Sequence, residues 1–170
     1  MARAGVARRL ILFFAAFLAI ASGCTRPSTM EAAFRSAFPD QDTNQSVVLE
    51  AIDPGGSTGS SGDLFTLLLR NQSGGPVVYN PSSDVHGMIW DEAAEQWLEV
   101  DNRVETADSS LIIGAEPGAA PSIDYVDFWP AESGAAPPYT LRIVVEADLL
   151  SESMVPQGKV IAFYDILVRQ

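Results

Sequence analysis

The chain of 170 residues contains one cysteine, Cys24, one histidine, His86, and one lysine, Lys159. A single cysteine excludes an intramolecular disulfide framework and any zinc site built from several cysteines. The 10 basic side chains are outnumbered by 22 acidic ones and are scattered along the chain. Because nucleic acid and anionic membrane surfaces are bound by clustered Lys and Arg, we expect no nucleic-acid partner and no electrostatic attachment to a membrane.

The longest apolar run, residues 10–21, is too short to serve as a transmembrane helix. Such a helix needs about 20 residues. The basic residues Arg3, Arg8 and Arg9 precede the run, and small residues follow it. This order of segments is typical of a secretory signal peptide, which we predict over residues 1–23.

The tetrapeptide Ala21-Ser22-Gly23-Cys24 at the end of this segment resembles the lipobox of bacterial lipoproteins. The resemblance implies cleavage before Cys24, lipid on its thiol, and an anchor in the cell membrane or outer membrane on an extracytoplasmic side. Ala21 stands where leucine is commonest in that family. Two or more acyl chains give stable anchoring, because each buried CH₂ contributes about 0.8 kcal/mol. The alternative is an ordinary signal peptide followed by a free or buried thiol.

A short amphipathic helix is predicted over residues 29–38, within a linker that spans residues 24–45. One helical face carries the apolar side chains Met30, Ala33, Phe34, Ala37 and Phe38. Ser28 and Glu31 have the spacing of a capping box, and Pro39 ends the helix. Because so short a helix is unstable alone, its apolar face must dock, either on the protein's own sheet or in the membrane interface.

Residues 46–170 consist of short apolar runs separated by Gly, Pro, Ser and Asn, and are long enough for a single core. We predict strands at 46–52, 64–71, 77–80, 87–90, 96–100, 103–105, 110–113, 123–128, 139–146 and 159–168. With no helical pattern between them, the strands predict an all-β, antiparallel sandwich. The segment LFTLLLRNQSGGPVVYNPSSD resembles the B to C hairpin region of immunoglobulin-like and fibronectin-III-like bacterial envelope domains. The resemblance implies an immunoglobulin-like β-sandwich and little chemistry.

Two late strands are predicted to differ in their surroundings. In residues 139–146, Leu141, Ile143 and Val145 share one face, and the other face is polar and predicted to be wet except at Val144. The last strand, VIAFYDILV, is apolar on both faces except for Asp165. We therefore expect the last strand to be central in its sheet.

Two short motifs match functional patterns only in part. The segment GGSTG fits the G-x-S-x-G nucleophile pattern at Ser57, but it lies in a loop between strands with no helix to follow. The segment DQDTN, residues 40–44, begins like a calcium loop, yet Gln45 stands where glycine is needed and Ala51 where an acidic ligand is needed. Neither motif predicts an active site.

The remaining polar candidates come in pairs. Asp84 and His86, two residues apart on a strand, point to the same side, but two ligands do not make a tight metal site. Asp124 and Asp127 are three apart, which places them on opposite faces and argues against a catalytic carboxylate pair. We predict no catalytic residue, no metal and no cofactor.

Aromatic residues are the remaining candidates for a partner surface. Trp90, Trp129, Tyr125 and the other large rings are assigned mainly to the core. Trp97 lies in an acidic turn and, if exposed, would contact an unknown protein or glycan partner. The sequence therefore predicts a lipid-anchored cell-envelope binding or structural module. The alternatives are a small secreted enzyme and an inhibitor-like or solute-binding domain.

Overall fold

The structure is a computed structural model of the chain, and it describes residues 28–39, 41–52, 58–60, 62–101, 111–114, 122–130 and 135–169. The signal peptide, Cys24 and the strand predicted at 103–105 lie outside these residues. Among the described residues, no helix has the length and apolar character that crossing a membrane requires.

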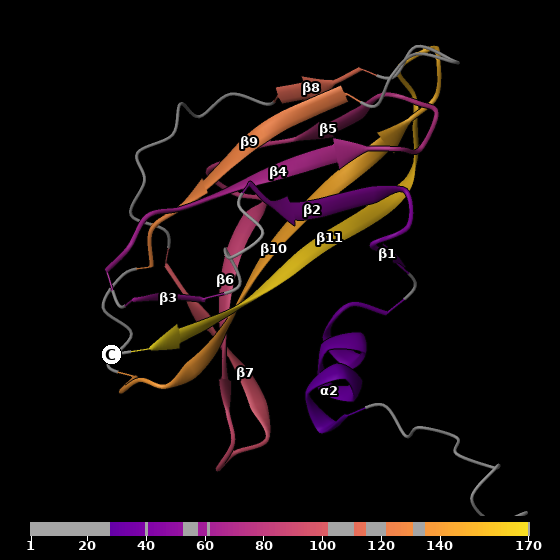
Figure 1. Cartoon of the computed structure of the whole chain (residues 1–170). Coiled ribbons are helices and arrows are strands. Elements are labelled where there is room, and N and C mark those ends of the chain that lie inside the picture. Colours follow the sequence, from indigo (N-terminus) through magenta and orange to yellow (C-terminus); the bar gives the residue numbers. More distant parts are fainter. Residues whose placement is uncertain are drawn as a thin grey trace, which may run out of the picture.

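The described strands form two sheets that pack face to face, so the all-β architecture is confirmed (Figure 1). Sheet A is built on the long hairpin of β10 (Tyr139–Leu150) and β11 (Pro156–Arg169). Its other members are β1 (Asp42–Thr43), β3 (Thr58–Ser60), β5 (Val77–Tyr79), β6 (Val85–Asp91), β7 (Gln96–Val100) and β8 (Leu111–Ile113). Sheet B has the order β2 (Val47–Ala51), β4 (Phe65–Asn71) and β9 (Ser122–Phe128).

The expectation of purely antiparallel pairing is wrong at one edge of sheet A. Strand β11 pairs in parallel with β1, where Asp42 lies opposite Val160, and with β3, where Thr58 lies opposite Leu167. The chain alternates between the sheets from β1 to β4, so β3 is reached through β2 of sheet B, whereas β1 directly follows α2. Strand β11 is far along the chain from both β1 and β3, so these parallel pairs do not depend on a single crossover helix. The prediction that β11 is central is confirmed, since β10 lies along its other edge.

The segment 64–79 is not a paired hairpin, contrary to the expectation from its resemblance to a B to C hairpin region. Strand β4 pairs with β2 and β9 in sheet B, whereas β5 pairs with β10 and β8 in sheet A. The crossing is held by the buried side chain of Asn71, whose Nδ2 donates to the carbonyls of Gly75 (2.8 Å) and Ile113 (3.0 Å). Turn residues predict that the chain reverses, but not which sheet receives the next strand.

The core between the sheets follows the alternation read from the sequence. Phe65, Leu67 and Leu69 of β4 are buried, and the inward residues of β10 face them from sheet A. On β6, a Cβ at Gly87 would lie 2.2 Å from Cζ of the buried Phe128. Glycine at position 87 therefore lets this ring pack directly on the backbone of sheet A.

Part of the outer face of sheet A, around Val144 and Ile161, is covered by α2 (Thr29–Ala37), which adds a third layer there. The helix begins as predicted, with the N–H of Glu31 donating to Oγ of Ser28 (3.3 Å). Under the helix, the outward residues Arg142 and Val144 of β10 are buried. The prediction of a wet outer face on this strand is therefore wrong there, because alternation along a strand cannot show that a helix from elsewhere covers the polar side.

Candidate functional site

The contact between α2 and sheet A brings together aromatic side chains, a buried arginine and two carboxylates. Phe34 lies at its centre, is only 1% exposed, and packs against Val144 and Ile161. Its ring centroid lies 5.0 Å from that of Phe163 and 6.3 Å from that of Trp97. The apolar stripe of the helix therefore docks on the protein's own sheet.

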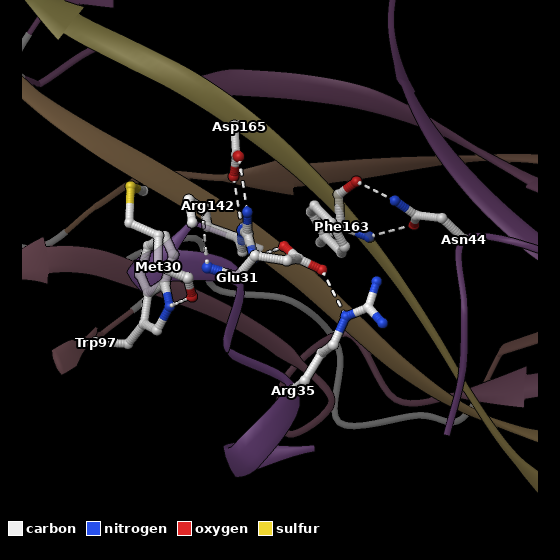
Figure 2. Close-up of polar contacts among 9 residues, drawn as sticks. Met30, Glu31, Arg35, Asn44, Trp97, Arg142, Phe163 and Asp165 are labelled. Atoms are coloured by element: carbon white, nitrogen blue, oxygen red, sulfur yellow. Dashed lines mark hydrogen bonds and ion pairs between the residues drawn. The ribbon is translucent and has the colours of Figure 1, made fainter. Parts of the chain in front are cut away.

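Arg142 is the buried charged residue of this contact, and it lies between Asp165 and Glu31 (Figure 2). It is 4% exposed, and its guanidinium binds Asp165 in a bidentate pair, Nε to Oδ1 at 2.7 Å and Nη2 to Oδ2 at 2.8 Å. Its Nη1 reaches Oε2 of Glu31 on the helix at 3.5 Å. The guanidinium carbon also lies 4.0 Å from the ring centroid of Phe163 and 4.4 Å from that of Phe34. Two carboxylates and aromatic faces thus replace the water lost by this cation.

Trp97 joins the helix to the β6–β7 hairpin. Its indole Nε1 donates to the backbone carbonyl of Met30 at 3.0 Å, and its ring centroid lies 4.6 Å from the guanidinium carbon of Arg142. Trp97 is half-buried in the contact rather than open to solvent. The hypothesis that Trp97 anchors a partner requires an exposed ring. In this structure its indole N–H already donates to the backbone of α2.

Asn44 holds the adjoining edge of β11. Its Nδ2 donates to the carbonyl of Phe163 (3.3 Å), and the N–H of Phe163 donates to its Oδ1 (2.8 Å) (Figure 2). The side-chain amide therefore pairs with the strand between the positions of β1 and β3. Of the calcium-like segment 40–44, Asp40 lies outside the described residues, and the side-chain oxygen of Asn44 is occupied by this backbone contact.

His86 lies on the outer face of sheet A between two carboxylates. Its Nδ1 is 3.1 Å from Oε1 of Glu99, and its Nε2 is 3.5 Å from Oε1 of Glu146. Asp84 instead accepts a hydrogen bond from the N–H of Asn80 (2.8 Å). The structure therefore places His86 with residues other than Asp84. Within the part of the chain that is described, no group of three or more His, Cys, Asp or Glu is arranged to hold a metal ion.

The two aspartates of β9 lie on opposite faces of sheet B, as their spacing predicted. Asp124 faces inward, and its Oδ2 accepts from the hydroxyl of Tyr79 (2.7 Å). Burial, reinforced by the hydrogen bond and the charge of Asp124, raises the pKa of Tyr79 above its usual range. Asp127 faces outward and accepts from Oγ1 of Thr66. Both carboxylates have structural partners.

Two aromatic residues that were assigned to the core lie at the surface instead. Tyr125 on the outer face of sheet B is 64% exposed, and Trp129 is 43% exposed. Phe128, between them in the sequence, is fully buried. Alternation along β9 places neighbouring rings on opposite faces, and no described element covers the outer face at Tyr125.

A pocket of about 430 Å³ opens near one end of the sandwich. Its lining includes the exposed apolar residues Ile52 and Leu64, together with Phe65 and the carboxylate of Asp63. The Oδ2 of Asp63 already accepts from the N–H of Ser60 (2.7 Å). Ser57 of the nucleophile-like motif lies outside the described residues.

The comparisons with known proteins give no family. No protein-family model, no curated protein and no solved structure matches this chain.

Sequence reasoning missed the cluster around Arg142, although signals for it were present. Val144 was the one apolar residue on a face taken as wet, and Asp165 was the one charge in an apolar strand. These residues lie in adjacent strands, where Arg142 pairs directly with Asp165. Val144 is apolar on an otherwise polar face, and Asp165 is a single charge on the paired strand. Together they indicate that another element covers this outer face.

Proposed function

We propose that this chain is a lipid-anchored protein of the cell envelope whose sandwich acts as a binding or structural module. The observation that carries the proposal is the lipobox-like segment Ala21-Ser22-Gly23-Cys24 behind a basic and an apolar segment. Lipid on Cys24 would hold the protein at the cell membrane or outer membrane, outside the cytoplasm. The proposal assigns no catalytic residue and no cofactor.

We further propose that the sandwich is immunoglobulin-like. In such domains one sheet contains strands A, B and E, and the other contains C, F and G. The order β2-β4-β9 in sheet B and the order β11-β10-β5 in sheet A support this correspondence. The crossing from β4 to β5 then corresponds to the B to C connection, which passes between the sheets.

The partner of such a module is proposed to be a protein or a glycan, bound at the loops that join the strands. Strand connections such as the segment DPGGSTGSSGD, residues 53–63, and the Asp91 to Gln96 turn at the tip of the β6–β7 hairpin can change in sequence without disturbing the core. The net charge of −12 favours a partner with basic character. Binding should then weaken as the salt concentration rises.

The lipid anchor is tested by Cys24→Ser in a host that processes lipoproteins. Metabolic labelling with a radioactive fatty acid should give a labelled wild-type band and no label in Cys24→Ser, because the acceptor thiol is lost. Thr25→Ser, a similar change at the neighbouring residue, is the control and should keep the label. Equal labelling of wild type and Cys24→Ser would overturn the proposal.

A solute-binding function is the second candidate, and the pocket beside Ile52 and Leu64 is the observation that favours it. Its volume of about 430 Å³ lies within the usual range for small-ligand sites, and its lining is partly apolar. A small apolar solute bound there should raise the melting temperature, and Leu64→Asp should abolish that rise.

A further inference from the structure

The first half of α2 is fixed to the body of the protein by three different interactions. Trp97 donates a hydrogen bond to the carbonyl of Met30, Arg142 forms an ion pair with Glu31, and Phe34 is buried between the sheet and the rings around it. These contacts fall on consecutive turns of a helix that begins at Thr29. The start of the helix therefore cannot move independently of sheet A while they are formed.

The distance from this fixed point to the proposed lipid anchor is short. Only Thr25, Arg26 and Pro27 separate Cys24 from the capping residue Ser28. A fully extended chain covers about 3.6 Å per residue, so Ser28 lies at most about 14 Å from the lipidated cysteine. Packed layers lie about 10 Å apart, so this limit is shorter than the roughly 20 Å from the α2 layer to sheet B.

From these two facts we infer that α2 holds the sandwich against the membrane surface in one orientation. The α2 layer and the β6–β7 hairpin face the lipid, and the outer face of sheet B faces away from it. The inference rests on the proposed lipidation of Cys24 and adds a membrane-facing surface to it. An unstructured tether would instead let the domain tumble freely above the bilayer.

The side that faces the lipid has the chemistry of a surface that lies on a bilayer without entering it. The outward side chains of α2 include Thr29, Ala32 and Ser36, which are small and exposed, and Arg35, whose exposed charge pairs with Glu31. The nearby hairpin turn carries Glu92 and Glu95, which are also exposed. Acidic side chains are repelled by anionic headgroups. The lipid anchor therefore holds the protein at the membrane, and the acidic side chains keep its surface at a distance from the headgroups.

The same orientation presents the outer face of sheet B to the space beyond the membrane. On this face the ring of Tyr125 pairs across the strands with Leu68, and Val48 lies on the neighbouring strand. The ion pair between Arg70 and Glu50 (2.6 Å) borders these side chains. Any partner that approaches from outside the membrane meets this face and the loops around it first, so in this orientation the Asp91 to Gln96 turn is not among the partner-binding loops.

The orientation is tested by energy transfer from the lipidated full chain to acceptor lipids in vesicles. Lipid blocks the thiol of Cys24, so one introduced cysteine provides a unique labelling position. Ala93→Cys places the donor in the hairpin turn, and Tyr125→Cys places it on the outer face of sheet B. We expect higher transfer from position 93, because sheet B is packed about 10 Å from sheet A, on the side away from α2, and position 125 is therefore further from the lipid.

Two variants remove the constraint in different ways. An insertion of about ten Gly and Ser residues between Pro27 and Ser28 lengthens the tether and leaves the helix contacts intact. Phe34→Ser releases the helix from sheet A. Both should abolish the difference between the two labels, whereas the control Ala37→Ser, at an exposed position of the same helix, should preserve it.

The failure of this inference is distinguishable from the failure of the proposed anchor. If the wild-type protein does not float with vesicles, the lipid anchor and the fixed orientation are both wrong. If it floats and carries lipid but transfer from positions 93 and 125 is equal, only the fixed orientation is wrong. A difference that survives the tether insertion would also overturn it.

Discussion

The guanidinium of Arg142 is a positive charge placed where the protein has almost no water. Removing such a charge from water is costly unless it is paired and hydrogen-bonded. Asp165 supplies two parallel hydrogen bonds, Glu31 adds a second carboxylate, and the ring of Phe163 presents its negative face. The stability of the contact between α2 and sheet A therefore depends on keeping the partners of Arg142 in place.

Removing the carboxylate of Asp165 from its ion pair with Arg142 should lower the free energy of unfolding. Asp165→Ala leaves the buried guanidinium with the aromatic rings and a single, more distant carboxylate, that of Glu31 at 3.5 Å. We expect a loss of about 2–4 kcal/mol in the free energy of unfolding, toward the low end because Asp165 is partly exposed. Urea denaturation of the chain without residues 1–24 measures this loss.

The exposed ion pair on the same helix provides the matched control. Arg35 contacts Glu31 at 3.1 Å, but its side chain is 73% exposed, so Arg35→Ala should cost less than about 1 kcal/mol. The double variant Arg142→Met with Asp165→Ala should recover much of the loss, because no unpaired charge then stays buried. Similar costs for Asp165→Ala and Arg35→Ala would contradict this account of Arg142.

At the scale of the element, α2 is a helix of nine residues. So short a helix is marginal by itself in water, and packing of its apolar face has to stabilise it. Phe34 supplies most of that packing, while Phe38 is only partly buried beside it. The helix and the outer face of sheet A therefore form as one unit.

Phe34→Ala should lower the free energy of unfolding by about 3–4 kcal/mol, the usual cost of deleting a buried phenylalanine ring. Ala37→Ser, at an exposed position, should change it by less than about 0.5 kcal/mol. Denaturation followed by the fluorescence of Trp97 and its neighbours measures both. If Phe34→Ala leaves stability unchanged and instead weakens vesicle binding by the delipidated protein, the helix acts in the membrane interface.

At the scale of the whole molecule, the two sheets are joined through their core by polar contacts as well as by apolar packing, and one of these contacts is between Tyr79 and Asp124. Tyr79 belongs to β5 in sheet A, and Asp124 belongs to β9 in sheet B. The buried hydroxyl donates to the carboxylate, and this arrangement disfavours the phenolate next to a negative charge. The folded protein therefore holds this proton more tightly than the unfolded chain does.

This difference predicts a loss of stability at high pH. The pKa of Tyr79 is raised on folding, so its contribution is fully present below the ordinary tyrosine pKa of about 10 and falls as the pH rises above it. The slope is at most about 1.4 kcal/mol per pH unit. Tyr79→Phe should be about 1 kcal/mol less stable at neutral pH, and this deficit should shrink above about pH 10.

Stability curves of the wild type and Tyr79→Phe between pH 7 and about pH 11 check the prediction. Curves that stay parallel over this range would contradict it. A smaller deficit at the alkaline end, with no change in the slope of denaturant dependence, would confirm that Tyr79 stays protonated in the folded state.

The strands and the helix were predicted where a local pattern specifies them. The alternation in β4 and the stripe and cap of α2 arise from neighbouring residues, so they were found close to their true bounds. The hairpin of β10 and β11 is longer than predicted, because pairing between the strands continues past residue 146 through Asp148 to Leu150, opposite residues 156–160. The site around Arg142 was not predicted, since its members come from α2, β7, β10 and β11.

The sequence by itself determined the signal-like start, the all-β character, the amphipathic helix and the opposite faces of Asp124 and Asp127. Each depends on spacing within a few residues, and backbone geometry converts that spacing into a face or a cap. The tertiary structure alone decided that β4 and β5 lie in different sheets, that β1 and β3 run parallel to β11, and that α2 covers Arg142. These features join residues distant in the chain, where burial and the pairing of charges, rather than local geometry, choose the partner.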